Sequence, residues 1–383
     1  MIDVFELSAL SGLEKTWNTF LFTGEIMNIS SLIPVPDFIP LDWPWFQFFL
    51  ILTFFFHLIA MNLMLGSAII AATERFKRHV NDPDPRDLDK PIAKRLPFII
   101  AFAVNLGVAP LLFLQVLYGH FMYTSSILMA VYWLSVIGLV ILAYYGAYIY
   151  AYRKTEDGKT FIITAIALLL LVIGFLFTCN MTLMITPEKW PAYFTHAHGR
   201  FLPLKDPVLI PRYLHFVLSA LAVAGLFHAA LGVWKKKTDQ TDISLGNNGI
   251  KWFFYATLLQ IPVGIWFVAA LPRPVMLWFM GGSAYATILF AAGMVCSLVC
   301  LVFGFQKKIK PAVFTLIPTV MLMVLIRDEM RTAYLNGYFS LDDLVVKPAF
   351  SPVIFFSACL IFGAVMVVYM IKLALQAVQE DKK

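Results

Sequence analysis

The sequence predicts an all-α membrane protein that crosses the bilayer about nine times. Of its 383 residues, 60% are hydrophobic and only 14% are charged, and the mean hydropathy is +0.80. Apolar runs of about 20 residues, the length that spans a bilayer as a helix, recur along the chain. Basic residues gather in alternate loops, as in multi-pass proteins. These observations exclude an ordinary soluble domain.

The first 44 residues form a segment of their own, ahead of a single transmembrane domain at 45–383. They lack the basic start and compact apolar core of a cleavable signal peptide. Leu7–Phe22 is expected to form an amphipathic helix on the outer surface. Four prolines then precede the first span: Pro34, Pro36, Pro40 and Pro44.

Nine apolar stretches are expected to cross the membrane. The eighth is the weakest, because charged residues follow it directly, and its polar end is expected to extend it. The stretches are Trp45–Thr73, Leu96–Phe121, Ser126–Tyr152, Phe161–Thr186, Tyr213–Trp234, Lys251–Ala270, Leu277–Phe305, Val313–Ile326 and Pro352–Ala377.

Loop charges predict the orientation. Basic residues concentrate in Glu74–Arg95, Lys235–Lys237, Lys307–Lys310 and Lys382–Lys383, which fall on one side if there are nine spans. The positive-inside rule makes that side cytoplasmic, with the N-terminus outside and the C-terminus inside, in a bacterial inner membrane. The net charge of +6 follows from this asymmetry, so it does not indicate nucleic-acid binding.

The long outer loops Pro187–Arg212 and Arg327–Ser351 are the expected docking surface for a periplasmic partner, in a hetero-oligomer. The four cysteines lie in spans and none belongs to a CxxCH motif, which excludes covalent c-type haem by this signature. The chain also lacks a Walker loop, a GxGxxG fingerprint, HExxH and a nucleophile elbow.

Three histidines inside spans are the strongest candidate site residues. An intramembrane imidazole is costly without a partner, and neutral imidazole is a common axial ligand of haem iron. His57 lies among aromatic residues in the first span. His215 and His228 share the fifth span, separated by ~20 Å along the helix, so one haem cannot use both. The alternative for His57 and His228 is a structural hydrogen bond, to a carbonyl or, for His228, to a serine.

Four other histidines carry weaker signals. His120, at the outer end of the second span, could be a ligand or an interfacial residue. His196 and His198 form a His-x-His pair in an outer loop, which lacks a third metal ligand. His79 lies among basic residues in a cytoplasmic loop and is expected to be solvated.

Two further features lie near the outer face. Met280 could supply a thioether as the sixth ligand of a haem, although most methionines are packing residues. Arg327, Asp328, Glu329 and Arg331 end the eighth span. Arginines suit bidentate contact with haem propionates, so these charges could serve a cofactor or proton transfer. The alternative is an ion-pair network among themselves.

Several motifs resemble subunit I of the cytochrome bd quinol oxidases. WFQFFLILTFFFHLIAMNLMLG is similar to that family's first span, and VNLGVAPLLFLQVLYG to its second. CNMTLMITP is similar to a fourth-span segment, PRYLHFVLSALAVAGLF to the fifth span, and MGGSA to a later methionine segment. The resemblance covers about residues 45–300.

The resemblance implies nine spans, an outer N-terminus and haem cofactors. It makes His57 a haem ligand and pairs His215 with Met280 on a low-spin haem b. Three departures count against oxygen reduction. Gln115 stands where the oxidases carry a glutamate, the outer loop between the sixth and seventh spans is short, and the family's eighth-span glutamate has no secure match.

The expected function is therefore electron transfer. The chain is expected to be a haem b subunit, with two or more haems, of a respiratory oxidoreductase. It would exchange electrons between membrane quinone and a periplasmic c-type cytochrome or similar redox protein. Two alternatives stay open: a divergent bd-type oxidase that reduces oxygen, and a haem-free transporter or assembly subunit.

Overall fold

The computed structural model describes residues 29–81, 90–153, 155, 158–195, 198–234 and 240–380, so the expected Leu7–Phe22 helix lies outside it. The described chain is helical and contains no strand. Eight of its helices are long and apolar enough to cross a membrane, which confirms a polytopic all-α fold. They are α2 (Trp43–Asn81), α3 (Lys90–Leu128), α4 (Ala130–Tyr152), α5 (Lys159–Met184), α6 (Leu209–Trp234), α7 (Gln240–Ala270), α9 (Ala284–Phe305) and α10 (Ile309–Leu335).

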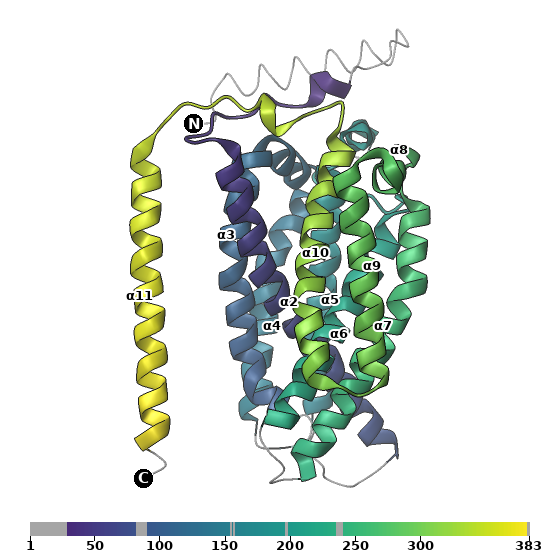
Figure 1. Cartoon of the computed structure of the whole chain (residues 1–383), viewed down its shortest axis with the longest axis vertical. Helices are drawn as coiled ribbons and strands as arrows, with labels where there is room; N and C mark the ends of the chain where they lie inside the picture. Colours follow the sequence, from purple (N-terminus) through teal and green to yellow (C-terminus); the bar gives the residue numbers. More distant parts are fainter. Residues whose placement is uncertain are drawn as a thin grey trace.

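A further helix, α11 (Phe350–Glu380), runs beside the bundle (Figure 1). Its described side chains are exposed all around the helix. It contacts the bundle through Phe356, whose ring lies 6.0 Å from Phe49 of α2 and 5.7 Å from Phe113 of α3, measured between centroids. Membrane lipid is the natural neighbour of its remaining apolar surface.

Two expected boundaries are wrong. The third span does not begin at Ser126, because α3 continues to Leu128 and α4 starts two residues later. The expected helix at Leu277–Phe305 is broken near its start into α8 (Arg273–Leu277), the π-helical turn η3 (Trp278–Gly282) and α9. Gly281 has φ 108°, which glycine tolerates but which ends a helix. The Ser283 side chain then caps α9.

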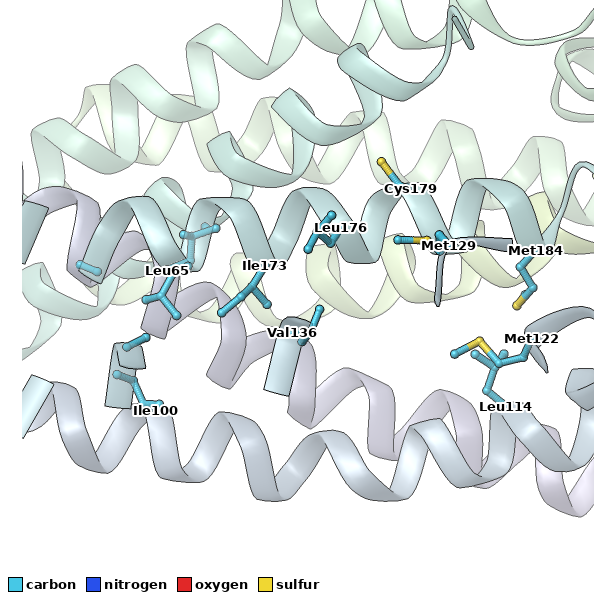
Figure 2. Close-up of a cluster of buried hydrophobic side chains, with 14 of the residues drawn as sticks. Leu65, Ile100, Leu114, Met122, Met129, Val136, Ile173, Leu176, Cys179 and Met184 are labelled. Carbon is cyan, nitrogen blue, oxygen red and sulfur yellow. The ribbon is translucent and has the colours of Figure 1, made fainter. Parts of the chain in front are cut away.

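The largest buried core joins α2, α3, α4 and α5, with side chains such as Leu65, Met122, Val136 and Ile173 interdigitating between the helices (Figure 2). Lipid gives little hydrophobic drive between helices, so close backbone approach matters more there. A Cβ on Gly66 would lie 2.1 Å from the carbonyl oxygen of Ala220 in α6. The contact between α2 and α6 therefore requires glycine.

Irregular segments cover the end of the bundle where α2 begins and α10 ends (Figure 1). They include η1 (Ile29–Leu32), η2 (Pro187–Thr195) and η4 (Leu341–Asp343). The Ile39 amide donates to the Val345 carbonyl at 3.1 Å, and the Lys347 amide donates to Ile39 at 2.9 Å. The segment before α2 is thus paired to the linker between α10 and α11.

Candidate functional site

His215 lies in α6, about 9 Å from the start of that helix. Its ring centroid is 6.2 Å from that of Phe267 in α7. A Cβ on Gly264 would lie 3.9 Å from Nδ1, so α7 passes close to the ring. Nδ1 is buried and has no hydrogen-bond partner among the described residues. The imidazole is therefore held by packing against α7, with a nitrogen left for another partner.

Arg212, one turn before His215, was not among the sequence candidates. Its guanidinium lies 5.8 Å from the ring centroids of Phe267 and Tyr334, and Nη1 donates to the Thr182 hydroxyl at 2.9 Å. It forms no ion pair with any described residue, although it hydrogen-bonds with Tyr334 and interacts at longer range with Asp206, which is paired with Lys189. An arginine inside an apolar span, three residues before a candidate ligand, was the available signal. Only the structure shows that Arg212 and His215 both lie next to the ring of Phe267.

His57 lies deeper, about 21 Å along α2. Its Nδ1 is 3.0 Å from the carbonyl oxygen of Ala103 in α3. A carbonyl only accepts, so Nδ1 carries the proton and Nε2 keeps a free lone pair. A Cβ on Gly107 would lie 2.8 Å from Cε1, so glycine makes room for the ring. This tautomer and orientation suit metal ligation through Nε2.

Arg327 and His57 both lie next to the ring of Phe54. Its guanidinium is 4.8 Å from the Phe54 ring centroid, and the Phe54 and His57 rings are 6.2 Å apart. The side chain is exposed, so an anion can reach it. Within the described ranges it has no ion pair or hydrogen bond. Arg327 is thus a cation without a carboxylate beside a candidate ligand.

The neighbouring charges of α10 are paired. Asp328 accepts from Gln47 Nε2 at 2.6 Å and from Arg331 Nη1 at 2.9 Å. The Arg331 guanidinium also lies 4.6 Å from the Tyr118 ring centroid. Glu329 accepts from the Trp278 indole at 3.2 Å. An ion pair therefore holds Asp328 and Arg331, and a hydrogen bond from the Trp278 indole holds Glu329. Arg327 is left as the available cation of the four.

Met280 lies in η3 with 51% of its surface exposed. The apolar cluster around Phe267 includes Met276 and Met330 instead. The pairing of Met280 with His215 stays a prediction. Met276 is the alternative candidate for a thioether ligand. It packs in the same apolar cluster as Phe267, whose ring lies next to that of His215.

His228 lies near the C-terminal end of α6 and is 1% exposed. Its Nε2 is 3.0 Å from the Ser67 hydroxyl oxygen in α2, which is also fully buried. Nδ1 has no partner among the described side chains. A role as a haem ligand stays a prediction, and the contact with Ser67 favours the structural alternative.

His120 is 9% exposed, and its ring lies 4.7 Å from that of Phe339, between centroids. Its Nε2 lacks a described partner. Gln115 is half-buried in α3 and makes no hydrogen bond with a described residue. Exposed His198 is described, but His196 lies outside the described residues, as does the His79 side chain. Neither His120 nor Gln115 lies in the two histidine–arginine arrangements.

Across the described residues, no group of three or more histidine, cysteine, aspartate or glutamate side chains could hold a metal ion by itself. Comparison with known proteins found no protein-family model that matches the chain and no curated protein that matches it. Functional inference therefore rests on the geometry of the bundle.

Proposed function

We propose that this protein is the membrane haem b subunit of a respiratory oxidoreductase, passing electrons between quinone and an outer redox partner such as a c-type cytochrome. One observation carries the proposal. Two histidines in the bundle each share an aromatic neighbour with a guanidinium that forms no ion pair with a carboxylate among the described residues. Haem offers both missing partners, because its iron binds imidazole and its propionates suit arginine.

The two arrangements would hold two haems. His215 and Arg212 would bind one near the outer face, with Met280 or Met276 as the second ligand. His57 and Arg327 would bind the other at greater depth. Bound haem supplies one-electron transfer, while the protein contributes the ligands, the cations and an apolar surround that excludes water.

A reduced-minus-oxidised spectrum of the purified protein tests the proposal. We expect a haem b band and no haem d band, with His215→Ala and His57→Ala each removing one haem. His198→Asn, in an exposed outer loop, is the control and should keep full haem content. A purified, folded protein without haem would overturn the proposal. A haem d band with cyanide-sensitive oxygen uptake would support the oxidase alternative.

The identity of the second ligand has its own test. Met280→Leu and Met276→Leu keep side-chain size but remove the thioether. Loss of a methionine ligand should lower the potential of the His215 haem, since thioether ligation raises it. If neither change shifts the potential, that haem does not use either methionine.

A further inference from the structure

A small polar cavity lies between α6, α7, α9 and α10. Its polar lining comes from all four helices: Ser219, Thr257, Gln260, Ser297, Cys300 and Thr319. Each of these residues lies roughly 15 Å or more from the outer end of its helix, near the middle of the span. A polar lining at this depth is costly unless its atoms find partners.

Three of the four hydroxyl protons at the cavity are already used, while the Ser219 hydroxyl makes no hydrogen bond with a described residue. Thr257 donates to the Phe253 carbonyl at 2.7 Å, Ser297 to Gly293 at 2.8 Å, and Thr319 to Thr315 at 2.7 Å. The amide of Gln260 donates to the His215 carbonyl at 3.3 Å. Each of these groups keeps an oxygen that can still accept. The cavity therefore presents several acceptors, with the Ser219 hydroxyl and the second N–H of Gln260 as donors, and suits an occupant that both donates and accepts.

The size and charge of the cavity limit the kinds of molecule that could occupy it. The space suits about one or two water molecules, far less than a quinone or a substrate. No carboxylate belongs to its lining, so a metal ion or ammonium there would keep an uncompensated charge. An apolar occupant would leave the acceptors unpaired.

We infer that this cavity is a binding site for ordered water, built from hydroxyl and amide oxygens of four helices in the middle of the membrane. The water donates hydrogen bonds to oxygens that the protein does not satisfy itself. Ser219 lies one turn below His215 in α6, so the site provides a polar, proton-exchanging neighbour beneath that residue. The inference does not depend on haem being bound.

Two native cysteines provide a matched test by hydroxyl-radical footprinting of the purified protein. Cys300 lines the cavity and is 2% exposed, whereas Cys179 is 0% exposed and lies in the core of α2–α5 (Figure 2). Radicals formed from bound water oxidise adjacent thiols, so Cys300 should be oxidised roughly tenfold faster than Cys179. Equal rates would overturn the inference.

Two further arms identify the occupant. Thr319→Val keeps the shape of the side chain but removes a hydrogen-bond acceptor. This change should bring the oxidation rate of Cys300 close to that of Cys179. Ser297→Ala replaces it if the first variant does not fold. Replacing sodium chloride with choline chloride should change nothing. A Cys300 rate that rises severalfold when sodium is withdrawn would show that a cation displaces water, and would overturn the inference.

Discussion

At the scale of single residues, the feature that most constrains function is a guanidinium that forms no ion pair with a described carboxylate. Arg212 and Arg327 both meet this description, and each lies against an aromatic ring that also contacts a histidine. Arg331 lies in the same region but forms an ion pair with Asp328, unlike Arg212 and Arg327. Anionic ligands are therefore expected at the first two positions and not at the third.

Replacing Arg212 with glutamine should lower the midpoint potential of the His215 haem. Loss of a nearby cation destabilises the reduced iron, and a shift of roughly 60 mV corresponds to a tenfold change in a one-electron equilibrium. Redox titration measures it. Arg273→Gln, an exposed residue of α8, is the control. A potential that Arg212→Gln leaves unchanged would remove Arg212 from the site.

The His228–Ser67 contact predicts a structural effect. His228→Ala and Ser67→Ala should each lower the free energy of unfolding by about 1 kcal/mol, with the double variant little worse, because both remove one interhelical hydrogen bond. Thermal unfolding of the four proteins measures this coupling. Haem content should stay constant; loss of a haem in His228→Ala alone would instead establish His228 as a ligand.

At the scale of helices, glycines determine how closely α6 and α7 approach. A Cβ on Gly225 would lie 2.7 Å from the Phe253 amide nitrogen and 2.8 Å from the Gly249 carbonyl oxygen. These are backbone atoms, which cannot move aside without separating the helices. The α6–α7 contact in turn positions Gly264 and Phe267 beside His215.

Gly225→Ala should therefore destabilise the protein by ~2 kcal/mol or more through overpacking. Gly138→Ala in α4 is the matched control, since a Cβ there meets no atom within 4 Å. That change should be neutral or slightly stabilising, because alanine favours helix. Unfolding temperatures in detergent compare the two, and equal values would contradict the packing argument.

The sequence predicted much of this element-level structure, because apolar runs and charged loops are local signals. The break inside the expected Leu277–Phe305 span was missed, although Gly281, Gly282 and Ser283 are residues typical of turns. Contacts across helices were not predictable, since a linear pattern does not say which faces meet. His57, His215 and Arg327 were therefore predicted as separate candidates, but the closeness of Arg327 to His57 and of Arg212 to His215 required the folded bundle.

At the scale of the whole molecule, the remaining prediction is which end of the bundle faces the cytoplasm. The Lys307–Lys310 turn and the end of α11 lie at the same end of the bundle, opposite the α7–α8 junction (Figure 1). With the basic end cytoplasmic, green fluorescent protein fused after the last residue should fluoresce. Alkaline phosphatase fused after Ala270 should be active, and the reverse pair of results would invert the topology.

The pairing of Ile39 with Val345 and Lys347 has a consequence for biosynthesis. It joins segments about 300 residues apart, so it forms only after α10 has been made and inserted. Phe339 belongs to the same late linker and lies against His120 and Phe121. The end of α3 that carries His120 therefore lacks its Phe339 contact through most of translation, which leaves this end accessible until the last contacts form.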